Sequence, residues 1–332
     1  PPPARGHHRP EMTHPGGLAG LVRGAARRSL ATALSACTLI GGGPGLRPAP
    51  RAMDPAPVPA PAEPSIASRA VEAHFTKVQA DLLARGLLRT DGGGVDTPYG
   101  PREIADNFIR IALYDEYVSE GGRLTAREVP SRLRRWEKPV RIGLRFGPSV
   151  PPERQAQDRA TVAAYAARLA RQSGLSIQVS DQSPNYWVYV VSEDERPAMG
   201  DQWAALFPGL DPRELDSATG MGLSTFCMVL AISDGNSPVY SGALAVIRSE
   251  LPDLLRTSCF HEELAQGLGL ANDYPRARPS IFNDDEEFAT LTSMDEILLK
   301  LLYDRRLKPG MREAEVRPML GPIVAGLVGG GS

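Results

Sequence analysis

The chain has 332 residues, of which 42% are hydrophobic, enough apolar material for one large domain or two ordinary ones. Its 37 basic and 39 acidic residues give a formal net charge of -2, so no overall field attracts nucleic acid or an anionic membrane surface. No run of about 18 apolar residues occurs, which argues against a membrane-spanning helix. We therefore expect no nucleic-acid partner, and partners must be inferred from particular sites.

Residues 1–40 have the pattern of an export signal, with Met12 as the expected start. Three arginines over 23–28 form a positively charged region, and an apolar stretch follows over 30–36. The four residues that end at Cys37 read Leu-Ser-Ala-Cys and resemble the lipobox of bacterial lipoproteins. That resemblance implies lipid attachment to Cys37 on the periplasmic side of the cell envelope, with the lipid as the only membrane anchor. The alternative is an accidental run of small residues before a cysteine.

Residues 41–65 are dense in proline and alanine and are expected to form an extended tether. Apolar residues then recur at helical spacing over 66–88, and a second helical stretch is expected over 102–118. These stretches define an N-terminal helical part over 66–130.

The main domain is expected over 131–315, where strand and helix patterns alternate. The expected elements are strands at 138–146, 175–180, 185–192, 224–233 and 239–249 and helices at 153–172, 212–217, 251–270 and 291–303. The turn cluster SDGNSP joins the last two strands into a hairpin, with the strand at 239–249 on the sheet edge. Residues 316–332 are expected to be a flexible tail. This order predicts an α+β fold.

Cys227 and Cys259 remain as an even pair once Cys37 is set aside. An oxidising compartment allows one disulfide between them. The bridge would tie the helix expected at 251–270 to the strand expected at 224–233. Two separate buried thiols are the alternative.

The most informative stretch is HEELAQGLGLAND, residues 261–273. It invites comparison with the pattern HExxHxxGxxH, in which two histidines one helical turn apart bind zinc and the glutamate is the general base. Started at His261, the pattern fails, because Ala265 stands where the second histidine belongs. His74 is the only other histidine after Cys37, so the mature chain that begins there cannot form a three-histidine site.

Shifted by one residue, the stretch keeps the spacing as EExxQxxGxxND. The first ligand, the general base, the second ligand, the turn glycine and the third ligand then fall on Glu262, Glu263, Gln266, Gly269 and Asn272 or Asp273. Zinc prefers nitrogen and sulfur ligands, whereas these oxygens suit calcium, magnesium or manganese. The metal therefore stays undecided. If the glutamates are buried, they indicate function, and if they are exposed, they are a solvated face.

Several long segments resemble domain-of-unknown-function family 2927, a family of bacterial exported proteins in the zincin-like metallopeptidase clan. The segments are GLLRTDGG (86–93), NFIRIALYDEY (107–117), HEELAQGLGLAND (261–273), PSIFNDDEEFATLT (279–292) and LLYDRRLKPGM (301–311). The resemblance implies a zincin-like mixed sheet with an antiparallel edge strand, an active-site-type helix and an N-terminal helical layer. By analogy it implies zinc as a cofactor, and it makes Met294 the counterpart of the methionine beneath the metal. Core packing at a helix start is the alternative for Met294.

The acidic run over 283–287 is read as the N-terminus of a helix, where acids complement the helix dipole. Calcium binding is the alternative.

Two functions remain for the whole chain. The first is a metallopeptidase-like hydrolase of the cell envelope, in which Glu263 activates water while Glu262, Gln266 and Asp273 or Asn272 order a metal or the substrate. The second is a catalytically inactive zincin-fold lipoprotein that binds a peptide or an envelope protein along the edge strand.

Overall fold

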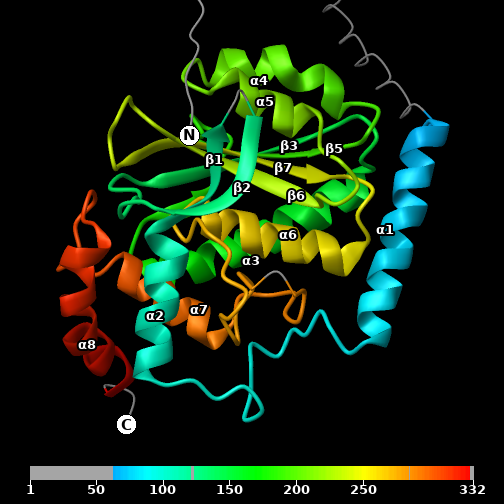
Figure 1. Cartoon of the computed structure of the whole chain (residues 1–332). Helices are drawn as coiled ribbons and strands as arrows, with labels where there is room; N and C mark the ends of the chain where they lie inside the picture. Colours follow the sequence, from blue (N-terminus) through cyan, green and yellow to red (C-terminus); the bar gives the residue numbers. More distant parts are fainter. Residues whose placement is uncertain (1–62, 121–122, 284, 330–332) are drawn as a thin grey trace, which may run out of the picture. The chain divides into compact units, whose positions relative to one another are not determined.

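A mixed sheet of five strands lies at the centre of the fold (Figure 1). The computed structural model describes residues 63–120, 123–283 and 285–329, which belong to one compact unit. The sheet order is β4-β3-β5-β7-β6, from the strands β3 (Val140–Phe146), β4 (Ile177–Val179), β5 (Tyr186–Val191), β6 (Cys227–Ser233) and β7 (Tyr240–Arg248). Only β6 runs antiparallel to its neighbour, so the predicted α+β fold with an antiparallel edge strand is confirmed.

The edge strand is β6 rather than the strand expected over 239–249. That stretch forms β7, which pairs with β5 on one side and with β6 on the other. All residues of β7 but one are buried, as a strand with two partners and two covered faces requires. β6 is only partly buried, and among the described strands it pairs with β7 alone.

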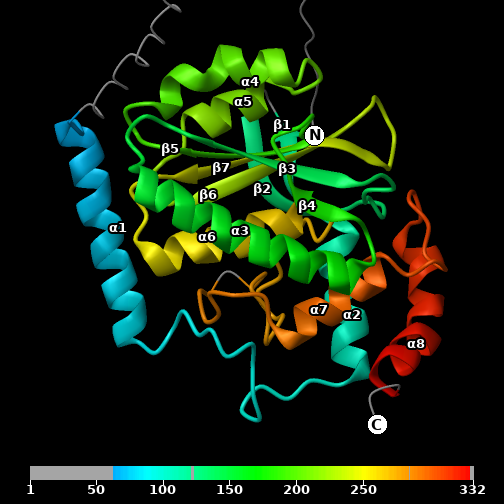
Figure 2. The ribbon, with the colours of Figure 1, turned by 180° about the vertical axis from the view of Figure 1, so that it is seen from behind.

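Helices cover both faces of the sheet, as Figures 1 and 2 show. One face carries α3 (Pro152–Ser173) and α6 (Asp253–Gln266), and the other carries α4 (Gly200–Leu206) and α5 (Pro212–Thr219), preceded by the 3-10 helix η1 (Arg196–Met199). Because successive strand residues point to opposite faces, β5 contributes Val188 to the larger core and Tyr189 to the smaller one. The sequence analysis did not predict α4 or η1.

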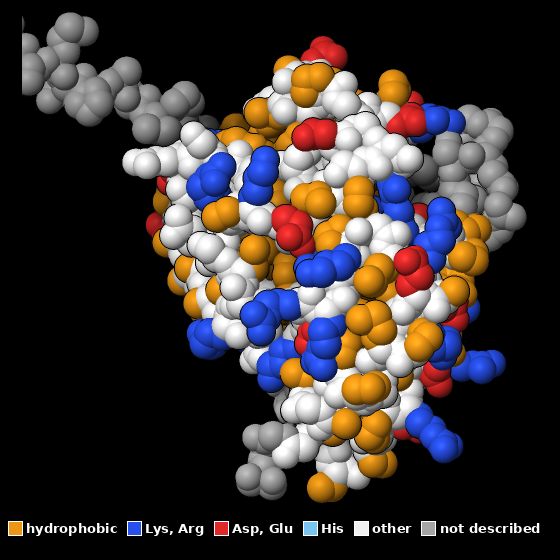
Figure 3. Space-filling view, turned by 90° about the vertical axis from the view of Figure 1, so that its left-hand side faces the viewer, with side chains coloured by type: hydrophobic (Ala, Val, Ile, Leu, Met, Phe, Trp, Pro, Cys, Tyr) orange, Lys and Arg blue, Asp and Glu red, His pale blue; other side chains and the backbone are white. Residues whose placement is uncertain are grey.

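A further group of helices packs on the far side of α3 and α6. It consists of α2 (Pro101–Ala112), α7 (Ser293–Leu302) and α8 (Glu313–Gly329). The flexible tail expected from residue 316 is therefore wrong as far as Gly329, because α8 buries Val316, Leu320, Ile323 and Val324. On the face where α8 lies, Lys and Arg side chains are interspersed with hydrophobic ones (Figure 3).

Helix α1 (Ile66–Ala84) lies beside the N-terminus of α6 and apart from α2 (Figure 1). The Gln79 side chain accepts hydrogen bonds from the backbone N–H groups of Leu254 and Leu255, both at 3.1 Å. These are two of the N–H groups that have no acceptor within the helix itself. α1 thus caps the start of α6.

The helix expected over 102–118 ends at Ala112, and a two-stranded ribbon follows it. The ribbon pairs β1 (Tyr114–Glu120) with β2 (Arg123–Pro130) in antiparallel register. The apolar spacing of α2 was correctly recognised, but it was extended into YDEYVSE, which contains the strand formers Tyr and Val.

Some expectations fall outside the described residues, including the export signal, Met12, Cys37 and the tether as far as residue 62. In the part of the chain that the structure describes, no helix has the length and hydropathy needed to cross a membrane.

Helix α6 ends at Gln266, earlier than the predicted residue 270, and the chain then turns at Gly269. Gly269 has a φ of 123°, a conformation that residues with a side chain rarely adopt. A Cβ atom at this position would lie 2.3 Å from the carbonyl oxygen of Arg134. The turn therefore requires glycine.

We expect Gly269→Ala to lower the free energy of unfolding by about 3 kcal/mol, because backbone strain and the overlap with Arg134 add together. Urea unfolding measures the loss. Gly326→Ala is the matched control, since its Cβ would meet no heavy atom within 4 Å in α8, and we expect no loss of stability there. Equal effects of the two substitutions would contradict the requirement for glycine at position 269.

Candidate functional site

Four aromatic side chains donate hydrogen bonds to backbone carbonyls of α6 and of the turn that follows it. The pairs are Tyr165 with His261 (2.7 Å), Tyr186 with Glu263 (2.6 Å), Trp136 with Gly267 (2.8 Å) and Tyr303 with Leu268 (3.0 Å). Burial raises the pKa of the three tyrosine hydroxyls, so they stay protonated and remain donors. These bonds fix the rotation of α6 and decide which of its side chains face outward.

A cleft of about 810 Å³ lies between α6 and the edge strand β6. It is lined by β6, by the segment 220–222 and 224–226 ahead of that strand, and by Glu262, Glu263 and Gln266 of α6. The side chain of Glu263 is buried, with its residue 4% exposed, whereas Glu262 and Gln266 are partly exposed. The shifted frame of the motif therefore places its carboxylates and its amide in one cavity.

Two arginines after β2 also line the cleft. Arg134 forms an ion pair with Asp115, and Arg132 donates to the carbonyl and side-chain oxygens of Asn236 at 2.9 and 2.6 Å. Asn236 lies in the turn between β6 and β7, so Arg132 connects the base of the ribbon to that turn. Neither arginine is predicted as a site residue by the sequence, because nothing in their spacing distinguishes them from surface charges.

Asp273 and Asn272, the two alternatives for the third ligand position, lie in different surroundings. Asp273 lines the cleft and accepts a hydrogen bond from Gln266 Nε2 at 3.1 Å. Asn272 is buried and does not line the cleft, because its side chain donates to the carbonyl of Arg110 at 2.9 Å. Its backbone N–H also bonds Ile111, so Asn272 joins α2 to the turn after α6. Asn272 is therefore a structural residue and not part of the cleft.

His261 faces away from the cleft. Its ring stacks on Tyr165 with centroids 3.8 Å apart, and its Nδ1 accepts a hydrogen bond from the N–H of Leu291 at 3.0 Å. Burial, with a smaller contribution from the Arg168 guanidinium, lowers the pKa of His261 to about 3. The residue is a neutral acceptor in the core.

The predicted disulfide between Cys227 and Cys259 is present. It ties the first residue of β6 to α6, so the strand and the helix on either side of the cleft are covalently joined. Cys227 lines the cleft, whereas Cys259 is 1% exposed.

The donor atoms of the cleft determine which metal ion it could bind. Within the described residues, the Sγ of Cys227 and one carboxylate oxygen each of Glu262 and Glu263 lie within 4.8 Å of one another. The sulfur is held in the disulfide and is not a thiolate. The other described histidine, His74, is exposed on α1. The nitrogen and sulfur donors that zinc prefers are thus missing from this site.

Two buried arginines fix the segment ahead of β6. Arg248 donates to the carbonyls of Met221 (2.6 Å), Gly222 (2.8 Å) and Thr225 (3.0 Å), and Arg196 also reaches Met221. Both guanidiniums pair with Glu193 at 2.6 Å. Because they satisfy the carbonyls of this segment from inside, the wall of the cleft has a set shape.

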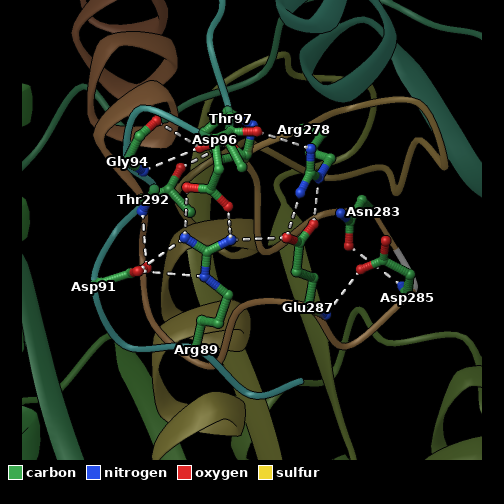
Figure 4. A network of polar contacts seen from close by, with 12 residues as sticks. Arg89, Asp91, Gly94, Asp96, Thr97, Arg278, Asn283, Asp285, Glu287 and Thr292 are labelled. Atoms are coloured by element: carbon green, nitrogen blue, oxygen red, sulfur yellow. Dashed lines mark hydrogen bonds and ion pairs between the residues drawn. The ribbon is translucent and has the colours of Figure 1, made fainter. Parts of the chain in front are cut away.

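The described residues of the acidic run, 283 and 285–287, lie in a loop and not at a helix N-terminus, which corrects the prediction. Glu287 pairs with Arg278 at 2.5 Å and with Arg89 at 3.0 Å, and Arg278 is the main cause that holds the pKa of Glu287 below its usual value (Figure 4). Arg89 also binds Asp91 and Asp96. Glu286, next to this network, lines the cleft.

Met294 is fully buried in the first turn of α7, where its sulfur accepts a hydrogen bond from Asn107 Nδ2 at 3.3 Å. It does not line the cleft. Its position agrees with core packing at a helix start.

The fold and the site define an α+β domain with a carboxylate-lined cleft beside an exposed edge strand. Over residues 101–321 the chain matches the family described as "Protein of unknown function (DUF2927)", and it belongs to that family. No curated protein and no solved structure matches the chain significantly.

We expect His261 to make the fold less stable in acid. The usual pKa of 6.5 falls to about 3 on folding, so between these values the unfolded chain binds more protons and stability rises with pH. His261→Asn keeps an acceptor for Leu291 but removes the titration. From pH 7 to 4.5, wild-type protein should lose about 2–3 kcal/mol more of its unfolding free energy than the variant. If the unfolding free energies of the two proteins, measured with urea, fall equally over this pH range, His261 is not the titrating group.

Proposed function

We propose that the protein binds an extended polypeptide segment in the cleft, by adding it as a further strand to β6. The observation that carries this proposal is the outer edge of β6, which no strand within 63–120, 123–283 and 285–329 pairs with, and which lines the cleft. An exposed edge offers a row of backbone donors and acceptors, and extended peptides satisfy them by strand addition.

The rigidity of the cleft supports the proposal. The Cys227–Cys259 bridge joins β6 to α6, and Arg248 holds the segment ahead of β6. A preformed edge loses little conformational entropy when a peptide binds.

The charge of the cleft indicates which peptides it prefers. Six acidic residues line it against two arginines, Arg132 and Arg134, and this excess of negative charge attracts Lys and Arg side chains of a bound segment. A cationic polypeptide, supplied by a peptide or by an envelope protein, is the expected ligand.

The arrangement of elements supports a zincin-like domain as the setting. The resemblance stated above implies strands and a helix, an antiparallel edge strand, an active-site-type helix and then a second helical part. From β3 on, the chain has β3, α3, β4 and β5, then η1, α4 and α5, then the edge strand β6 and its partner β7, and then α6, α7 and α8.

Strand addition predicts a specific response to N-methylation of the peptide. Binding peptides are first selected from a displayed random library. Each is then synthesised in two forms, with N-methyl groups on the backbone nitrogens of either its odd-numbered or its even-numbered residues. One set should weaken binding by at least about tenfold and the other should not, because only every second N–H of an added strand faces β6. Isothermal titration measures both affinities. Equal effects of the two sets, or no selected peptide at all, would refute the proposal.

A second candidate function is hydrolysis of the bound segment, with Glu263 as the general base. The observation that favours it is the place of Glu263, a buried carboxylate at the cleft beside Glu262, with Gln266 and Asp273 close by. Zinc, which the zincin resemblance implies, does not fit the oxygen donors of this site. Glu263 would take a proton from the attacking water.

Glu263→Gln should lower the hydrolysis of the selected peptides by at least about 100-fold, because it removes the proton acceptor and keeps the shape of the side chain. Mass spectrometry of the peptide products measures the rate, and thermal unfolding verifies the fold. The matched control is Glu72→Gln, at an exposed position on α1, which should leave the rate of hydrolysis unchanged. If wild-type protein binds the peptides without cleaving them, hydrolysis is excluded and binding stands.

We also propose that the protein is exported and lipid-anchored through Cys37. The lipobox-like Leu-Ser-Ala-Cys supports this location, and so does the Cys227–Cys259 disulfide, since disulfides persist in oxidising compartments. In a host that processes lipoproteins, wild-type protein should fractionate with the membrane and carry acyl mass at its first residue. Cys37→Ser should abolish both. A water-soluble wild-type protein without acyl mass would rule the anchor out.

A further inference from the structure

We propose that reduction of the Cys227–Cys259 disulfide creates a metal site in the cleft, in which the Cys227 thiolate and the carboxylates of Glu262 and Glu263 bind a zinc-type divalent cation. The geometry carries the inference, since the three ligand atoms already lie within 4.8 Å of one another. Such a cluster needs only small side-chain rotations to place all three atoms around one ion.

The protein that has the disulfide intact lacks this site. The two glutamates are hard oxygen donors, and the sulfur that would complete a zinc-type ligand set is bonded to Cys259. Reduction changes the donor set from two carboxylates to two carboxylates and a thiolate, which suits zinc or cobalt.

The reduction step uses an external dithiol. Its thiolate attacks the Sγ of Cys227, which lines the cleft, and the Cys259 sulfur leaves as a thiolate into the core, where it takes up a proton. The second thiol of the reagent then displaces Cys227 from the mixed disulfide. The dithiol becomes a cyclic disulfide, two electrons pass to the protein, and Cys227 is released facing Glu262 and Glu263.

The cluster gathers negatively charged groups at one point of a cleft that Arg132 and Arg134 also line. Glu262 and Glu263 bring two carboxylates close together, and like charges at such separations repel. A thiolate adds a third negative charge on the same side. A divalent ion offsets this repulsion, and the metal in turn keeps Cys227 deprotonated.

The inference does not depend on the proposed function, because it concerns the donor atoms and not a peptide. It gives the cleft two states, one with β6 bridged to α6 by sulfur and one with β6 and α6 bridged by a metal ion.

The test is a Co²⁺ titration of the full chain with Cys37→Ser, so that no third thiol contributes. The variant Cys259→Ser mimics reduction at Cys227 without any reductant. We expect it to bind one Co²⁺ per chain with a near-ultraviolet sulfur-to-cobalt charge-transfer band. Its affinity should be at least about tenfold above that of the disulfide-bonded protein, and Glu262→Gln or Glu263→Gln should remove at least about tenfold of it.

The matched control is Cys227→Ser, which leaves the buried Cys259 thiol and should show no charge-transfer band. If Cys259→Ser does not fold, the titration uses protein that keeps both Cys227 and Cys259. Its disulfide is reduced with a phosphine, which is then removed in the absence of oxygen. The proposal is overturned if neither reduced form shows the band, if the disulfide-bonded protein binds Co²⁺ equally well, or if the Glu262 and Glu263 substitutions have no effect.

Discussion

The hydrogen bonds that three tyrosines and one tryptophan donate to α6 and its following turn are the constraint on which the site depends. A helix C-terminus leaves carbonyls without intrahelical partners, and here Trp136 and Tyr303 supply donors to the carbonyls of Gly267 and Leu268. The same contacts orient the helix, so that Glu263 reaches the cleft while His261, two residues earlier, points into the core. Which side chains of α6 face the cleft is therefore decided by the rotation of the helix.

The sequence predicted most of this helix and could not resolve its end. The shifted frame brought Glu262, Glu263 and Gln266 to one face, because residues spaced by three or four share a face of any helix. Beyond Gln266 that rule stops, since Gly269 turns the chain and no periodicity tells which of two adjacent residues faces the cavity. Asp273 and Asn272 could be separated only by the contacts of Asn272 with α2.

The errors in the fold share one physical origin, which is contact between distant segments. Both hairpin strands are apolar in sequence, and the neighbour β5 decides which of them is interior. Likewise Glu287 pairs with Arg89, which comes from almost 200 residues earlier in the chain. The helix that was expected at the acidic run begins later, because Thr292 and Asp295 form its capping box.

Support for the cleft comes partly from outside the region that the family shares. The family match begins at residue 101, yet Gln79 caps α6, and Leu88 and Arg89 pair through their backbones with Glu286 and Glu287. A polypeptide trimmed to the matched region would expose the face that α1 covers and would release the loop that carries Glu286. We therefore expect the smallest part of the chain that folds on its own to be longer than the matched region and to include α1.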